Sequence, residues 1–304
     1  MMAISRSQLV KELEPGLNAL FGLEYKRYEN QHSEIYNEES SDRAFEEEVM
    51  LSGFANAQVK GEGSGVSFDE AQETFTARYT HETVALAFAI TEEAIEDNLY
   101  DRLASRYTKA LARSMSNAKQ VKSVEPLIQG LPTTNNFDSG DGVSLFNTAH
   151  PTVAGTFANT LATQADLNET SLEQSMIDIA QMTDERGLRI AARGVKMIIP
   201  SELQFTAERL MKSQGRTGTA DNDINAIVSM GMVPQGYRVN NYLTDSDAFY
   251  ILTDIPNGMK MFNRAPLTTA MEGDFDTGNV RYKARERYSF GVSDPRGIFG
   301  VEGA

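Results

Sequence analysis

Hydrophobic positions in the middle of the chain repeat every four residues over a stretch that lacks proline and glycine. This stretch runs from Thr91 to about Val124. Its apolar face consists of Ile95, Leu99, Leu103, Tyr107, Leu111 and Met115. Steps of four are typical of one face of an α-helix. We therefore predict one helix of about 50 Å that begins at the N-cap Thr91 and is stopped by Pro126.

A long β-hairpin is predicted directly before this helix. Val49–Val59 and Glu73–Ile90 are rich in strand-forming residues, and Gly61, Gly63 and Gly65 lie between them at a flexible tip. Two strands with so little apolar alternation cannot bury a core by themselves. We therefore expect the hairpin to project from the subunit and to be covered by another surface.

The N-terminal part combines a short apolar helix with an acidic segment. Ser5–Phe21 is expected to be helical, and Pro15 is expected to kink or split that helix. Glu24–Glu48 is polar and mostly acidic, and it ends in Glu46, Glu47 and Glu48. This segment is either a solvated arm or an arm that orders against neighbouring subunits.

The C-terminal half reads as a mixed α/β region. Helices are expected at Thr170–Met182, closed by Gly187, and after Pro200, and a mobile loop is expected at Arg216–Asp223. Strands are expected at Val195–Ile199, Tyr237–Leu243, Phe249–Thr253, Met259–Phe262 and Val280–Val292.

Composition limits the function classes. The chain has 304 residues, a formal net charge of −15 and no cysteine. Disulfides and thiolate metal sites are therefore excluded. No apolar region of a signal peptide and no run as long as a membrane span occurs, so we expect a soluble protein made in the cytosol. The negative charge argues against tight nucleic-acid binding, but it suits a protein that encloses nucleic acid.

Motifs that carry chemistry are absent or incomplete. No Gly-Lys dipeptide of a phosphate loop occurs, and the spacing of Gly61, Gly63 and Gly65 fits a hairpin tip better than a dinucleotide site. Asp221, Asp223 and Asn225 imitate the start of a calcium loop, which lacks its turn glycine and its final glutamate. His150, before Pro151, is expected to be a structured loop residue. We therefore predict no catalytic, cofactor-binding or metal-binding residues.

Four cations alternate along the last predicted strand. Arg281, Lys283, Arg285 and Arg287 would share one face of it. They form either a solvated, salt-bridged face or a partner surface for the acidic run Glu46–Glu48 of an adjacent subunit.

Three local motifs resemble those of one protein family. Leu145–Pro151, with the sequence LFNTAHP, resembles the LFNxxHP segment of tailed-phage major capsid proteins, especially Mu-like major head subunits. Gly194–Pro200 resembles their strand that leads through a proline into a helix. Arg285–Gly297 resembles their closing R-Y-x-x-G-x-x-D-x-R-G signature, with Pro295 where an aromatic residue is common. The resemblance extends from about Glu24 to the end of the chain.

This resemblance implies the α+β Hong Kong 97 fold. The N-terminal arm would be residues 1–48, the extended E-loop 49–90 and the P-domain with its spine helix 91–140. The A-domain would be residues 141–261, and the closing strands, mostly P-domain, 262–304. Contacts between subunits would involve Glu46–Glu48 and the hairpin tip, Lys60 to Gly65.

The family function implied is a structural major capsid protein. It would assemble into pentamers and hexamers that form an icosahedral-type shell around packaged viral DNA, without a cofactor. Expected partners are further copies of the chain, a separate scaffold protein, a portal and a decoration protein. Some relatives crosslink an E-loop lysine, for which Lys60 is the candidate. The alternatives are an encapsulin-type compartment shell of the same fold and a soluble α/β enzyme.

Overall fold

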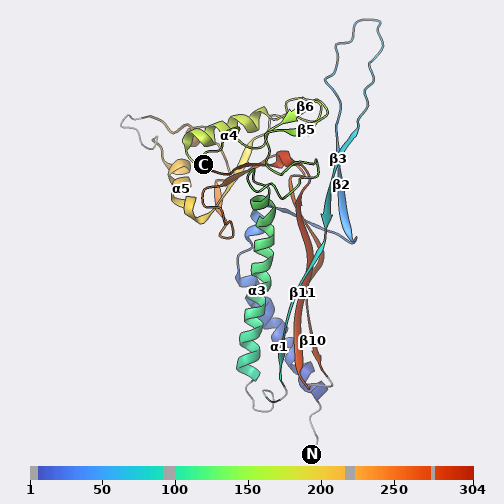
Figure 1. The fold of residues 1–304 in the computed structure, drawn as a ribbon, viewed down its shortest axis with the longest axis vertical. Coiled ribbons are helices and arrows are strands. Elements are labelled where there is room, and N and C mark those ends of the chain that lie inside the picture. Colours follow the sequence, from blue (N-terminus) through green and yellow to red (C-terminus); the bar gives the residue numbers. More distant parts are fainter. Residues whose placement is uncertain (1–5, 92, 94–99, 216–222, 275–277) are drawn as a thin grey trace, which may run out of the picture.

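The computed structural model describes residues 6–91, 93, 100–215, 223–274 and 278–304. The molecule has an elongated base of helices and a long sheet, an α/β region at one end of that base, and a hairpin that projects beside this region (Figure 1). The predicted α+β class and the general order of elements are confirmed.

The base consists of two helices packed on one face of a four-stranded sheet. The helices are α1 (Arg6–Arg27) and α3 (Tyr100–Gln129). The strand order is β1–β10–β11–β4, formed by β1 (Asn37–Ser40), β10 (Met259–Gly273), β11 (Val280–Val292) and β4 (Glu82–Ile90). Leu111 and Met115 of α3 are buried against Tyr282 of β11, so the predicted apolar face of the helix is the face that packs.

The ends of both helices differ from the prediction. Pro126 does not stop α3, which continues to Gln129 because Leu127 and Leu131 are buried in the core beyond it. Proline so near the end removes one helical hydrogen bond, and burial of the two leucines offsets this. Pro15 does not split α1, which is one continuous helix. The predicted beginning of the long helix falls on residues 92 and 94–99, which lie outside the described residues.

The hairpin is shorter in its strands and longer in its loop than predicted. Strand β2 (Phe45–Leu51) pairs with β3 (Glu73–Thr80), and residues 52–72 between them form no strand. The single returning strand that we predicted is two strands, because the chain leaves β3 at His81 and then pairs as β4 with β11. His81 is buried at this break, with its ring nitrogens 2.9 Å from the Ser41 and Ser289 hydroxyls.

The α/β region has its own sheet and core. The strand order is β12–β9–β7–β8, formed by β12 (Ile298–Val301), β9 (Phe249–Thr253), β7 (Gly194–Ile199) and β8 (Tyr237–Val239). Two helices, α4 (Glu169–Gln181) and α5 (Gln204–Lys212), accompany the short 3₁₀ helix Ser201–Leu203 and the short helix α6 (Ala226–Ser229). A small hairpin of β5 (His150–Thr152) and β6 (Gly155–Phe157) completes the region.

Most predicted elements of this half are confirmed. The α4 helix is buried through Leu172, Met176 and Ile179, and it ends at Gln181, before Gly187. Strands β9 and β11 have the predicted bounds, whereas β8 stops at Val239. Strand β10 continues eleven residues past Phe262, because β11 pairs with it again from Thr268 to Gly273 and a register shift between Ala265 and Thr268 accommodates Pro266. Most of the predicted mobile loop, residues 216–222, lies outside the described residues.

Candidate assembly surfaces and a buried polar junction

The loop of the hairpin exposes large apolar side chains. Val59 and Phe68 are 99% and 97% exposed, and Phe54 and Val66 are more than half exposed. The loop extends away from the rest of the molecule (Figure 1). Lys60 and the predicted glycines lie at its tip, where the Ser64 amide donates to the Gly61 carbonyl and Gly63 has a φ of +80°. A soluble protein seldom exposes such side chains together unless another surface covers them.

One contact ties the loop to the α/β region. The Arg186 guanidinium donates to the Glu70 carbonyl over 2.5 Å and lies 3.9 Å from the Asp69 carboxylate. Asp69 in turn accepts the Ala55 amide across the two legs of the loop at 2.7 Å. The base of the loop is therefore fixed, and the segment between these residues extends beyond it.

The predicted acidic contact residues already have partners within the chain. Glu46 accepts the Ser41 hydroxyl at 2.7 Å, and Glu47 lies 3.7 Å from Arg78. Glu48 binds Lys260, whose amine also lies 3.1 Å from Glu39. Burial alone would lower the pKa of Lys260, but the two carboxylates raise it above its usual value. Glu47, with its side chain 45% exposed, is the most accessible of the three.

The predicted row of cations is present on the solvent face of the long sheet. Arg281, Lys283 and Arg285 are exposed, whereas Arg287 is half-buried. Arg281 forms an ion pair with Asp274. No ion pair between described residues joins this row to Glu46–Glu48 of the same chain.

The opposite face of β11 carries a buried carboxylate that sequence reasoning missed. Glu286 is 2% exposed and lies 3.6 Å from the Lys119 amine of α3. The Tyr25 hydroxyl of α1 donates to the same carboxylate at 3.4 Å. Burial raises the pKa of Glu286, and Lys119 and Tyr25 only partly oppose it. Its alternation with the buried Tyr282 and Tyr288 is the sequence signal that could have revealed it.

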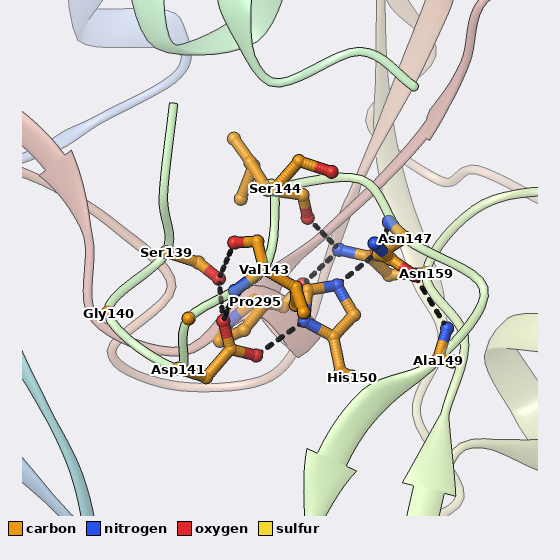
Figure 2. Close-up of polar contacts among 12 residues, drawn as sticks. Ser139, Gly140, Asp141, Val143, Ser144, Asn147, Ala149, His150, Asn159 and Pro295 are labelled. Carbon is orange, nitrogen blue, oxygen red and sulfur yellow. Dashed lines mark hydrogen bonds and ion pairs between the residues drawn. The ribbon is translucent and has the colours of Figure 1, made fainter. Parts of the chain in front are cut away.

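A second buried polar group lies where the loop after α3 meets the closing segment. His150 is fully buried and stacks on Phe157 with a ring separation of 4.7 Å. Figure 2 shows His150 between Asp141 and Asn159. Its Nδ1 lies 2.6 Å from Asp141 Oδ2, and its Nε2 lies 3.0 Å from Asn159 Oδ1.

Asn159 is the centre of this junction. Its amide nitrogen donates to the carbonyls of Leu145 at 2.7 Å and Pro295 at 3.0 Å, and its oxygen accepts the Asn147 amide at 2.9 Å. These three bonds fix which end of the amide faces His150. Both ring nitrogens of His150 therefore face oxygen atoms of buried neighbours.

The acidic partner of this histidine is held ionised. Burial alone would raise the pKa of Asp141. Hydrogen bonds from His150, Ser139 and the Val143 amide outweigh burial, so the pKa is lower than usual. His150 of the LFNTAHP motif thus belongs to a buried polar clamp, with Asp141 and Asn159, that joins separate segments of the fold.

The closing D-x-R-G motif forms a neighbouring clamp. Arg296 is 3% exposed and donates to Glu185 at 2.6 Å, to Asp294 at 3.3 Å and to the Thr183 carbonyl at 2.8 Å. Its guanidinium lies 4.1 Å from the centre of the Phe157 ring. Burial raises the pKa of Asp294, and the charge and hydrogen bonds of Arg296 oppose this. These groups are buried and contact one another, so they join the closing segment to the rest of the fold.

The other sequence candidates for chemistry have structural roles. Asn225, from the incomplete calcium motif, caps α6 by accepting the Ile227 and Val228 amides. Among the described residues, no group of three or more acidic or histidine side chains is arranged to hold a metal ion. The same part of the chain contains no helix that is long and apolar enough to cross a membrane.

Comparison with known families decides what kind of protein carries these features. The model of a family described as phage capsid protein matches residues 73–301. The chain belongs to this phage capsid protein family. The match includes the hairpin's returning strand, the long helix, the α/β region and both buried clamps.

Solved structures of low sequence identity share the fold. The virus-like particle from Pyrococcus furiosus matches with a TM-score of 0.54 and 10% identity, over 95% of this chain and 98% of that one. The capsid of Myoviridae phage XM1 matches with a TM-score of 0.54 and 12% identity, over 89% of this chain and 89% of that one. The capsid of an empty GTA particle matches with a TM-score of 0.52 and 12% identity, over 90% of this chain and 89% of that one. No curated protein matches the sequence.

The expected Hong Kong 97 type of fold is thereby confirmed, and this phage capsid protein is a structural subunit of a virion shell that assembles from copies of itself. The assignment to the Mu-like subfamily and the domain boundaries remain predictions.

Proposed function

We propose that this phage capsid protein forms pentamers and hexamers that close into an icosahedral-type shell around packaged viral DNA. The observation that carries the proposal is the projecting loop, whose exposed apolar side chains no described part of its own chain covers. A contact between different surfaces of identical subunits generates rings and closed assemblies when it is repeated. The protein acts as a structural component without enzymatic activity.

We assign the segments of the chain to domains according to the pattern of the family. Residues 1–48 act as the arm, 49–90 as the E-loop, 91–140 and most of 262–304 as the P-domain, and 141–261 as the A-domain. The acidic base of the hairpin, chiefly Glu47, faces the row Arg281, Lys283, Arg285 and Arg287 of an adjacent subunit. Each exposed pair contributes only about 0–1 kcal/mol, but the contact repeats throughout a shell.

The proposed partners are mainly further copies of the chain. Synthesis takes place in the host cytoplasm, and a separate scaffold protein, a portal and a decoration protein complete the particle. The net charge of −15 keeps the contact with enclosed DNA weak and independent of sequence. A compartment shell with protein cargo is the alternative within the fold, and the nucleic-acid content of purified particles separates the two.

The test is deletion of the loop segment from Lys60 to Phe68. The subunit should still fold, because the cores lie elsewhere, but shells should fail to close. Gly65→Ala is the matched control, since a Cβ at Gly65 meets no atom within 4 Å. Circular dichroism checks the fold, and sedimentation checks assembly. Normal shells from the deletion variant would refute the proposed role of the loop.

A further inference from the structure

The long helix α3 is cationic over most of its length, although the chain has a net charge of −15. Its acidic residues are Asp101 and Glu125, which lie near its two ends. Every charged residue between them is basic: Arg102, Arg106, Lys109, Arg113, Lys119 and Lys122. Charge of one sign gathered on one element indicates a partner of the opposite sign.

Packing separates these cations into two groups. Lys119 and Lys122 form ion pairs with Glu286 and Glu82 of the long sheet, so both serve contacts within the subunit. Three exposed cations have no acidic partner in the described part of the chain: Arg106, Lys109 and Arg113. Positions three and four apart lie on one face of a helix, so these three form one stripe on the solvent side of α3.

Two cations of this stripe line a hollow between α3 and α1. The hollow has a volume of about 570 Å³, and its lining combines Lys109 and Arg113 with Ala110, Ser114 and Asn117 of α3 and with Glu24 and Tyr28 of α1. Glu24 is its one carboxylate, with its side chain only 14% exposed, 3.5 Å from the Arg27 guanidinium and 3.3 Å from the Tyr28 hydroxyl that donates to it. The hollow therefore presents cations and hydrogen-bond donors without a large aliphatic side chain. This chemistry suits phosphate oxygens better than an apolar peptide segment.

The cations on the opposite face of the base differ in this respect. Glu272 stands opposite Arg281 in the pairing of β10 with β11, and Arg281 forms an ion pair with Asp274. Two carboxylates therefore accompany one end of that row, whereas none lies between the cations along α3. The helical face is the better surface for a polyanion.

We propose that Lys109 and Arg113, with Arg106 one turn away, bind phosphate groups of the enclosed DNA. The proposal rests on the proposed function, because it names the surface with which the shell meets the DNA that it encloses. Contacts to phosphate carry no base readout, so binding is independent of DNA sequence. A few cations in a subunit of net charge −15 keep each contact weak.

A cleavage reagent attached to a single thiol tests this contact, because the chain has no cysteine of its own. Ala110→Cys places the thiol in the hollow beside Lys109 and Arg113, and an iron chelate attached to it cuts nearby nucleic acid. The matched variant is Ala87→Cys, since Ala87 is equally small and exposed but stands opposite Lys283 on the other face of the base. In DNA-filled particles, the first variant should cut the packaged DNA and the second should not.

Equal or greater cleavage from Ala87→Cys would overturn the inference. The proposed function would stand in that case, because the particles are closed and contain DNA. Closed shells of the unmodified protein that contain no DNA would instead overturn the proposed function, and the inference with it.

The role of charge is tested by adding Lys109→Gln/Arg113→Gln to Ala110→Cys. An equilibrium that depends on two phosphate contacts falls about tenfold when salt rises from about 50 mM to about 200 mM. Cleavage should show this dependence in the parent and lose it in the glutamine variant. Arg209→Gln/Lys212→Gln, which removes two exposed cations from α5, is the matched control and should leave the dependence unchanged.

Cleavage that does not depend on salt in the parent would overturn the proposed role of the two cations. If Ala110→Cys particles show no cleavage and the glutamine variant fails to assemble with the scaffold, the stripe binds an acidic protein segment, and the proposal is wrong.

Discussion

Replacement of Asn159 by leucine should severely destabilise the subunit. Asn159 is fully buried, and its side chain satisfies the Asn147 amide, the ring of His150 and the carbonyls of Leu145 and Pro295. Leucine has a similar volume, so it creates little cavity, but it leaves all four groups without this partner. The variant therefore isolates the polar contribution of the junction from its packing.

The expected magnitude follows from those contacts. A buried polar group left without a partner costs about 1–3 kcal/mol. The Pro295 carbonyl still accepts the Ile298 amide, so three groups are left without a partner, and even at the low end and without strict additivity they give a loss of about 3 kcal/mol or more. A natural domain has a free energy of unfolding of only about 5–15 kcal/mol, so the variant should lose a large share of its stability.

Denaturant unfolding of unassembled subunits, followed by circular dichroism, measures this loss. Asn159→Asp should also be strongly destabilised, because it keeps the two acceptor contacts but places a buried carboxylate oxygen against the carbonyls of Leu145 and Pro295. Asn117→Leu, at an exposed position of α3, should change the free energy of unfolding by less than about 0.5 kcal/mol. A loss below about 1 kcal/mol for Asn159→Leu would refute the reasoning that the junction holds the fold.

Three further predictions concern the interior and the covalent state. Burial raises the pKa of Glu286, so its ionised form at pH 7 costs the folded protein free energy. Glu286→Gln should therefore increase the free energy of unfolding at pH 7, as measured by denaturant titration. This increase should vanish as the pH falls towards about 4.3, where the carboxyl group of the unfolded chain is also protonated. Gly297→Ala should lower the melting temperature, since its Cβ would lie 2.3 Å from Gly258 Cα, whereas Gly65→Ala should not. Denaturing gels of intact particles should show one band near 33.5 kDa, and a ladder would implicate Lys60.

The hydrophobic periodicity of the sequence predicted those helices and strands whose buried face follows from their own apolar residues. The helix around Leu111 and Met115, the helix with Leu172 and Ile179, and the strand Phe249–Thr253 each carry a periodicity that matches their environment. Strand β10 was underestimated because the pairing with β11, rather than its own irregular pattern, keeps it extended past Phe262.

The buried polar groups were beyond sequence reasoning for a different reason. Asn159 and Pro295 are far apart in the chain, and only the closed fold brings the Pro295 carbonyl within 3.0 Å of the Asn159 amide. Likewise, nothing in the local sequence shows that Lys260 lies between Glu39 and Glu48. The cation row was located correctly because alternation along one strand is a local property.

Electron microscopy of the protein assembled with its scaffold tests the central claim most directly. We predict closed shells of pentamers and hexamers, with the hairpin loop of each subunit covered by a neighbour and with DNA inside mature particles. A compact monomer or small oligomer under all ionic conditions would contradict the account.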